Sequence, residues 1–364
     1  MKVFCDKTAL KEAVILVERM TGKQLSLPTL KGILFNTTEN ALILRATNLA
    51  VGIEVTIPAK IEHKGQVVLR GDVLSSVLSN IREKEVVLSL EHENLLITTA
   101  SSQNIIKALP NDEFPTLPNI EGNECVIDQQ VLIDGIRGVF FAAATTDIKP
   151  EISSVFIYSE NNYLVFVATD SFRLAEKKIK IKHALDIPKL LLPYKNIPDI
   201  LKTLESVKGV VTLTFDTHQL SLRTNTVYFT TRLIDGGFPD YRLIIPKEEK
   251  TKIVLLRQDL LSTLRLSTMF VDTFSQLTLS VIPQEKKVIL VSTNNDVGKS
   301  QSLLDAVITG PAIEVVCNSK YLLDVFQSIE DDSISFSFTE SNKAILVKGV
   351  HDTSFIYLLM PSKR

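Results

Sequence analysis

The chain has 364 residues, and one hydrophobic core rarely grows beyond about 250–300 residues, so we expect two or three domains. An apolar fraction of 45% and a charged fraction of 23% are those of a globular protein and exclude disorder, collagen and coiled coil as the main class. The net charge is −2, whereas a DNA-binding domain that reads a groove is usually strongly basic. A near-neutral chain can still have a local basic surface. The sequence has no apolar run near the roughly 18 residues of a membrane helix and no secretion signal, which predicts a cytoplasmic protein.

The sequence has few residues or motifs that could form a metal site, a catalytic site or a phosphate-binding site, and they are far apart. The cysteines Cys5, Cys125 and Cys317 lie far apart without a CxxC spacing, which predicts reduced thiols and no zinc site. The five histidines form no metal-binding pair, and no G-x-S-x-G motif occurs. The stretch Gly298–Ser300 resembles the end of a phosphate-binding loop, but Thr293 stands where that loop needs its first glycine. We therefore expect no cofactor, no metal and no catalytic residue.

The first third of the chain predicts strands and helices in a definite order. A strand and an amphipathic helix (KVFCDKTALKEAVILV, from Lys2) precede a hairpin (GILFNTTENALILRATN, from Gly32). A second helix (LRGDVLSSVLSNI, from Leu69) and a pair of alternating strands (LLITTASSQNIIKALP, from Leu95) follow. The apolar residues of the second helix repeat at i, i+3, i+4 and i+7, which places one helix face in the core: Leu74, Val77, Leu78 and Ile81.

The same order of elements recurs twice. Strand-and-helix segments begin at Cys125 and Ile253, and Leu10, Leu132 and Leu260 fall in register, 122 and 128 residues apart. Hairpins begin at Ser154 and Leu277, second helices at Leu192 and Cys317, and final strand pairs at Leu220 and Ile345. Phe114-Pro115 and Phe238-Pro239 mark the exits of the first two units. We predict three repeated domains (1–122, 123–247 and 248–364), each with two helices packed on antiparallel sheets of about eight strands, an α+β fold.

One carboxylate looks catalytic but has a structural interpretation. Asp170, in ATDSFRLA, is the strongest candidate for an acid or base. Its counterparts in the other repeats are Asn48 and Asn294, because Thr47-Asn48, Thr169-Asp170 and Thr293-Asn294 follow equivalent hairpins. Asn and Asp share the ability to cap a turn with a side-chain oxygen, so we expect turn capping at all three positions.

At the level of motifs the whole chain resembles the bacterial β sliding clamp family, the processivity subunit of DNA polymerase III. The resemblance rests on ATDSFRLA (168–175), LIDGGFPDYRLIIP (233–246), LPNDEFPTLP (109–118) and YLLMPSKR (357–364). It implies a head-to-tail homodimer that closes a ring around duplex DNA without reading its sequence. It also implies a clamp loader that opens the ring, and clients that include the replicative polymerase and other proteins with clamp-binding motifs.

A closed ring holds DNA by topology, so a few basic residues on exposed helix faces are enough for sequence-blind attraction. The candidates are Arg19, Lys23, Arg137, Lys195, Lys202 and Arg265. A solvated helix face is the alternative interpretation of each. For the dimer interface we predict Ile106, on the last strand of the first domain, and Met269, after the first helix of the third, as apolar anchors.

The resemblance further implies a cleft between the second and third domains that binds a short client peptide. Carried over by position, the cleft residues are Ile152, Thr169, Arg173, Leu174, Pro239, Ile244, Phe274, Asn318, Tyr321, Leu358, Leu359, Met360 and Pro361. For the aliphatic members, a place in the core is the alternative. The chain departs from the family pattern at Ser171-Phe172 (usually Gly-His), at Leu243 (usually Arg) and in its polar ending Ser362-Lys363-Arg364.

Two other classes of function stay open on the sequence alone. One is a triplicated protein-binding scaffold that does not encircle DNA. The other is an enzyme whose site is divided between domains, for which no motif argues.

Overall fold

The computed structural model describes residues 1–22, 27–110 and 114–362. Its residues form two compact units. The first contains Met1–Ile133 and Lys195–Leu233, and the second contains Asp134–Tyr194 and Ile234–Arg364. Each unit is described by itself.

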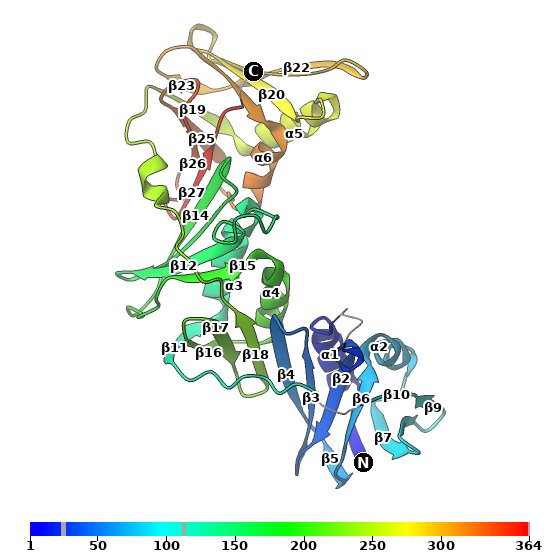
Figure 1. The fold of residues 1–364 in the computed structure, drawn as a ribbon. Helices are drawn as coiled ribbons and strands as arrows, with labels where there is room; N and C mark the ends of the chain where they lie inside the picture. The colour runs from blue at the N-terminus through cyan, green and yellow to red at the C-terminus, as the bar shows by residue number, and fades with distance from the viewer. Residues whose placement is uncertain (23–26, 111–113, 363–364) are drawn as a thin grey trace. The chain divides into compact units, whose positions relative to one another are not determined.

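The first unit has two antiparallel sheets (Figure 1). The smaller sheet has the order β5 (Lys60–His63), β1 (Lys2–Asp6), β7 (Glu85–Glu91), β8 (Asn94–Thr98) and β9 (Gln103–Ile106). The larger sheet has the order β10 (Ala108–Leu109), β6 (Gln66–Arg70), β2 (Gly32–Thr37), β3 (Ala41–Thr47), β4 (Val51–Pro58), β18 (Val227–Arg232), β17 (Gln219–Arg223), β16 (Val210–Phe215) and β11 (Asn123–Asp128). The helices α1 (Lys7–Glu18) and α2 (Gly71–Asn80) pack side by side, and α4 (Ile197–Ser206) also contacts α1.

The second unit repeats this arrangement. Its larger sheet has the order β15 (Leu190–Pro193), β12 (Ser154–Glu160), β13 (Tyr163–Thr169), β14 (Arg173–Lys180), β27 (Phe355–Leu359), β26 (Ile345–Gly349), β25 (Ser333–Phe338), β19 (Thr251–Leu256) and β23 (Val307–Thr309). Its smaller sheet has the order β22 (Gly298–Asp305), β21 (Lys287–Asn294), β20 (Gln276–Ile282) and β24 (Ile313–Asn318). Its helices are α5 (Arg257–Ser267), α6 (Ser319–Asp324) and the part of α3 (Gln129–Val139) that follows Ile133.

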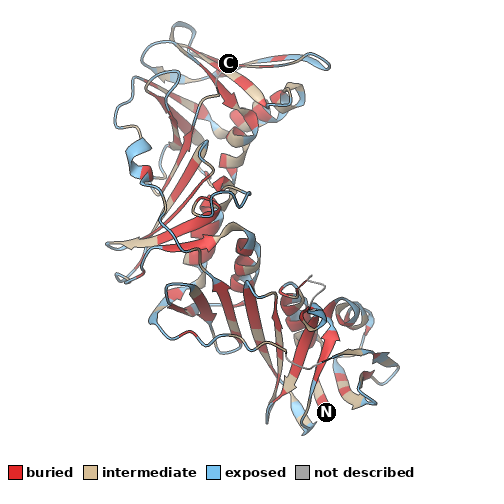
Figure 2. Cartoon of the chain, in the orientation of Figure 1, coloured by how far each residue is buried: buried red, intermediate tan, exposed pale blue. Residues whose placement is uncertain are grey.

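The predicted α+β class is confirmed, and the described residues contain six α-helices, two in each repeat. The helices form where apolar residues recur at helical spacing, and their apolar faces are buried (Figure 2). Leu10, Leu132 and Leu260, which the repeat places in register, are all at most 4% exposed. Asp6 caps the first helix, and its carboxylate accepts a hydrogen bond of 2.8 Å from the backbone N–H of Ala9.

The turn that follows each predicted hairpin is built in the same way in all three repeats. The side-chain oxygen of Asn48 accepts hydrogen bonds from the backbone N–H groups two and three residues ahead. Asp170 and Asn294 do the same in the second and third repeats. The prediction of turn capping is therefore confirmed, and Asp170 has a structural role.

Each larger sheet crosses from one repeat into the next. Strand β4 of the first repeat pairs with β18 of the second, and β14 of the second pairs with β27 of the third, both antiparallel. The middle repeat therefore gives half of its strands to each unit, which is why the chain divides into two units although it has three repeats. In the smaller sheets the equivalent strands, β22 and β9, each have one edge without a partner strand among the described residues.

Two of the three turns hold a residue with a side chain in the left-handed region. Leu49 has φ 73° and Ser171 has φ 77°, each directly after its capping residue. A left-handed conformation costs an L-residue about 1–2 kcal/mol, whereas glycine adopts it freely.

We predict that Leu49→Gly and Ser171→Gly each stabilise the fold by about 0.5–1 kcal/mol, because relief of this strain exceeds the extra chain entropy that glycine loses on folding. Thermal unfolding followed by circular dichroism measures the effect. The neighbouring Ala50→Gly is the matched control and should lower the midpoint, since Ala50 is absent from the residues with positive φ. A lower midpoint for both turn variants would contradict the prediction.

Candidate functional site

Most residues of the predicted cleft are brought together by the pairing of β14 with β27. Arg173 lies opposite Leu359 and Leu174 opposite Leu358 in this pair. Just beyond the strand ends, the backbone N–H of Met360 donates a 2.8 Å hydrogen bond to the carbonyl of Phe172. The N–H of Ser362 donates a 2.7 Å bond to the carbonyl of Val316, which ties the C-terminal segment to β24. Segments from the second and third repeats thus form one surface.

The Arg173 side chain joins the two repeats at this surface. Its Nε lies 3.0 Å from the carboxylate of Asp170, and an Nη lies 2.5 Å from that of Asp324, at the end of α6. The guanidinium also stacks on the ring of Tyr321, 4.2 Å from the ring centre. Burial opposes the charge of Arg173, but the neighbouring oxygens of Tyr357, Asp324 and Asp170 outweigh it and raise the pKa of Arg173. Arg173 therefore stays charged and fixes α6 against β14.

The Phe238–Arg242 segment is fastened to the same sheet by aromatic packing and hydrogen bonds. Phe238 stacks on Phe156 with ring centres 4.7 Å apart. The Tyr241 hydroxyl donates to the buried carboxylate of Glu176 and lies 2.9 Å from the hydroxyl of Tyr158. Burial, together with these partners, raises the pKa of Tyr241 far above its usual value, so the phenol stays neutral and keeps donating. The segment is thus held in one position beside β14.

The cleft residues differ in how much surface they offer to a partner. Leu174, Leu358 and Leu359 are at most 2% exposed, so their side chains belong to the core under the surface, as the alternative interpretation held. Ile152 and Thr169 are also buried, and the N–H of Ala144 donates to the carbonyls of both. The members with side chains partly or largely exposed are Arg173, Pro239, Ile244, Phe274, Asn318, Tyr321, Met360 and Pro361. Of these, Phe274 is 73% exposed, beside the strand pair that ends at Gln276 and Asn318.

Sequence reasoning did not assign three residues of this surface. Phe172 is 62% exposed and Leu243 is 81% exposed, and both lie at positions where the chain departs from the family pattern. The departure from the family pattern at these two positions is the feature of the sequence that could have indicated them. Asp324 had no signal in the sequence, because it lies 151 residues from the arginine that it binds.

The predicted DNA contacts lie on helices or at helix ends, and the described ones are exposed. Arg19 follows α1 and forms a 3.5 Å ion pair with Asp199 of α4. Lys202, on α4, lies 3.4 Å from Glu205. Arg137 is on α3, Arg265 is in the last turn of α5, and Lys195 lies in the single turn before α4. Lys23 is outside the described residues.

The two predicted dimer anchors differ in accessibility. Met269, in the single turn after α5, is 69% exposed. Ile106 is only 4% exposed, because side chains alternate along β9 and its side chain points into its own domain. The neighbouring Ile105 is 69% exposed. The exposed apolar side chain of β9 is therefore that of Ile105, and the prediction of Ile106 as an accessible anchor was wrong.

Among the described residues, no cluster of three or more His, Cys, Asp or Glu side chains is arranged to hold a metal ion. Gly298, Lys299 and Ser300 begin strand β22 and do not open a helix, as a phosphate-binding loop requires. Within the part of the chain that the structure covers, no helix has the length and apolar character to cross a membrane.

The chain matches, in order, the N-terminal, central and C-terminal domains of the DNA polymerase III beta subunit over residues 1–118, 126–240 and 242–363. It belongs to the DNA polymerase III beta subunit family. It is 26% identical to the beta sliding clamp of Synechococcus elongatus over 99% of both chains, and 25% identical to that of Staphylococcus epidermidis over 92% of both. The crystal structure of the DNA polymerase III beta subunit from Thermotoga maritima superimposes with a TM-score of 0.94 at 27% identity, over 100% of this chain and 99% of that one.

Family membership confirms the three-domain clamp fold, and it makes this clamp a non-catalytic processivity factor instead of an enzyme. It also disfavours the alternative of a triplicated protein-binding scaffold that does not encircle DNA. The Bacillus subtilis DNA polymerase sliding clamp, 25% identical over 100% of this chain and 99% of that one, has the same fold with a TM-score of 0.92.

Proposed function

We propose that this sliding clamp acts as a head-to-tail dimer: two copies close a ring around duplex DNA and tether the replicative polymerase for processive synthesis. The main support is the pairing of strands between successive repeats: β4 pairs with β18, and β14 pairs with β27. The equivalent strands β22 and β9 have no partner strand on the corresponding edge among the described residues. Unpaired sheet edges invite pairing, and a head-to-tail contact between two copies satisfies both edges at once.

The charge pattern supports a ring that slides. The net charge is −2, so the protein has no overall attraction that would arrest it on the phosphate backbone. Exposed basic side chains nevertheless occur on helices α3, α4 and α5 and at the end of α1. We propose Arg19, Arg137, Lys195, Lys202 and Arg265 as weak phosphate contacts, together with Lys23, which lies outside the described residues.

Encirclement predicts retention that depends on the topology of the DNA. A biotinylated linear duplex is incubated with the protein so that rings thread over its ends, and both ends are then blocked with streptavidin. We expect the protein to stay on this DNA after dilution into about 0.5 M salt, because phosphate contacts alone would be weakened by orders of magnitude. Cleavage of the duplex by a restriction enzyme should release it, as a pull-down assay measures.

Two results of that assay would contradict the proposal. Equal retention on blocked and cleaved duplexes would indicate ordinary adsorption. Loss from both would indicate that no closed ring had formed around the DNA.

The pairs within the chain predict the register between copies. The threonine before each capping residue has one partner on the next strand. The pairs are Thr47 with Gly52, Thr169 with Leu174 and Thr293 with Lys299, so Gly52, Leu174 and Lys299 are equivalent. Hairpins β17–β18 and β8–β9 have matching turns. The N–H of Thr224 donates to the carbonyl of Val227, and the N–H of Thr99 donates to that of Ser102. Val227 is thus equivalent to Ser102, and three residues further along, Thr230 is equivalent to Ile105. Because Gly52 pairs with Thr230, Lys299 should lie opposite the partner's Ile105, and Gln301 opposite its Gln103.

This register predicts a specific cross-link. Opposed residues in an antiparallel pair have Cα atoms about 4.5–5.5 Å apart, within disulfide range. The double variant Gln103→Cys with Gln301→Cys should therefore form a covalent dimer on mild oxidation near pH 8, detected by non-reducing electrophoresis. Burial raises the pKa of Cys5 and Cys317 to about 12 and that of Cys125 to about 11, so the native thiols stay unreactive at that pH.

The matched control combines Gln103→Cys with Asp305→Cys, which displaces one thiol by four residues along the exposed face of β22. It should give little cross-linked dimer, since the distance becomes about 13 Å. Stronger cross-linking in this control would rule out the proposed register.

We further propose that client peptides bind over β14, β27, α6 and the Phe238–Arg242 segment. The proposed contacts are Ile152, Thr169, Arg173, Leu174, Pro239, Ile244, Phe274, Asn318, Tyr321, Leu358, Leu359, Met360 and Pro361, with the fully buried leucines acting through the packing beneath. Support comes from the exposed apolar side chains of Phe172, Met360 and Phe274, which lie on segments joined by backbone hydrogen bonds near the Arg173–Tyr321 stack. A few polar groups set among apolar anchors suit an extended peptide.

Deletion of residues 360–364 should weaken binding of a fluorescent client peptide by roughly ten- to a hundredfold, since one buried apolar side chain contributes about 1.5–3 kcal/mol. Because this deletion also removes two backbone hydrogen bonds, Phe274→Ala is a second variant that removes only exposed surface. Val307→Ala, at a position 71% exposed in the same repeat, is its matched control and should bind normally. Unchanged affinity in both cleft variants would place the peptide elsewhere.

We propose domain boundaries at 122/123 and 247/248, where the linkers are rich in proline, and action in the cytoplasm. We also propose that a separate ATP-driven loader opens the ring, because the chain has no phosphate-binding loop of its own.

A further inference from the structure

The contact between copies can be compared with two contacts inside the chain. At the first internal junction, Arg19 at the end of α1 binds Asp199 of α4. At the second, the Ser328 hydroxyl donates a 2.8 Å hydrogen bond to the carbonyl of Gly138, in α3. In both cases the first helix of one repeat meets the second helical segment of the next. If the proposed ring forms, α5 of one copy meets α2 of the other as the third junction.

The repeat identifies the residues that occupy this third junction. In the helix register set by Leu10, Leu132 and Leu260, Arg19 corresponds to Met269 and Gly138 corresponds to Leu266. In the register of the second helices, Asp199 corresponds to Ser76 and Ser328 corresponds to Asn80. The ion pair of the first junction is thus replaced by methionine and serine.

Burial supports this correspondence. Val77 of α2 is partly exposed, whereas its counterparts Ile200 and Val325 are both 1% exposed. Leu266 is 49% exposed, whereas its counterpart Leu16 is 7% exposed. Apolar positions that are covered at the internal junctions are open at the two faces that the ring would join.

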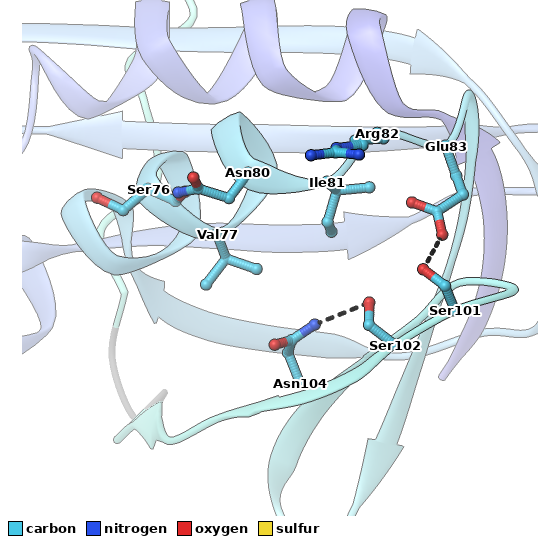
Figure 3. A pocket seen from close by; sticks show the side chains of 9 residues that line it. All are labelled: Ser76, Val77, Asn80, Ile81, Arg82, Glu83, Ser101, Ser102 and Asn104. Atoms are coloured by element: carbon cyan, nitrogen blue, oxygen red, sulfur yellow. Dashed lines mark hydrogen bonds between the residues drawn. The ribbon is translucent and has the colours of Figure 1, made fainter.

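The face on the first repeat is a hollow, shown in Figure 3. It is lined by Ser76, Val77, Asn80 and Ile81 of the α2 region, by Arg82 and Glu83 after it, and by Ser101, Ser102 and Asn104 at β9. The Glu83 carboxylate is engaged in its own chain, accepting hydrogen bonds from the hydroxyls of Thr99 and Ser101. Arg82 in the hollow and Arg265 on α5 have the same charge and cannot form an ion pair with each other.

We propose that Met269 and Leu266 of one copy fill this hollow in the other, and that ring closure, unlike the first internal junction, works without an ion pair between the helices. The proposed strand register also contains no ion pair at these positions, because it sets Lys299 opposite Ile105 and Gln301 opposite Gln103. This inference rests on the proposed ring and adds to it a physical property: closure is insensitive to salt.

Analytical ultracentrifugation of the full chain tests this property. Between about 0.1 M and 1 M NaCl the Debye length falls from about 10 Å to 3 Å, so ion pairs at the surface are screened. We expect the dimer dissociation constant to change less than about threefold over this range. A steep loss of dimer with salt would overturn the inference but not the ring. Absence of dimer at every salt concentration would instead contradict the proposed ring.

A pair of substitutions tests the placement. Met269→Arg alone should weaken the dimer roughly ten- to a hundredfold, because it removes a buried apolar side chain. Adding Ser76→Asp rebuilds the Arg19–Asp199 pair at the third junction and should recover at least about threefold in affinity at low salt, with the gain lost at high salt.

The control for this pair is Met269→Arg with Ser75→Asp, which adds the same charge one residue away and should recover less. Equal recovery with both acidic variants would show a general charge effect and overturn the placement. Unchanged affinity of Met269→Arg alone would overturn it as well.

Discussion

The pairing of strand edges across repeat boundaries is the interaction on which the rest of this structure depends. Strand β4 binds β18, and β14 binds β27, with backbone hydrogen bonds that no change of side chain removes directly. Because each larger sheet belongs to two repeats, neither repeat can rotate against the other without breaking a β-ladder. Strands β22 and β9 each have an open edge, and the same kind of pairing between these two edges is the basis of the proposed contact with a second copy of the chain.

The proposed peptide-binding surface is a consequence of one of these pairings. The pairing of β14 with β27 sets the turn that contains Asp170 beside α6, and Arg173 then binds a carboxylate from each repeat. The C-terminal segment continues from β27 and is bound through Met360 and Ser362 to the turn and to β24. A surface made from three distant segments is therefore held by backbone hydrogen bonds and by the ion pairs of Arg173.

The three junctions share a backbone plan but differ in their side chains. The first has an ion pair, the second has a hydroxyl bonded to a helix carbonyl, and the proposed third has apolar side chains. At the two junctions inside the chain, the paired repeats are covalently linked, so they stay close to each other whatever the side chains at the junction contribute. In the proposed ring, the third junction forms between separate molecules and opens to admit DNA, so its chemistry bears on how the ring closes.

The order and spacing of residues along the chain were enough to predict the repeat, the fold class and the family. Helical spacing around Leu10, Leu132 and Leu260, and the turn positions Asn48, Asp170 and Asn294, depend on local periodicity and on side chains that bond their own backbone. Tertiary structure decided which side chains are accessible and which distant residues meet. It placed Ile106 inside the domain and Ile105 outside, a difference of one residue that alternation along a strand makes decisive. It also brought Asp324 to Arg173 across 151 residues, because that contact depends on sheet pairing and on no local pattern.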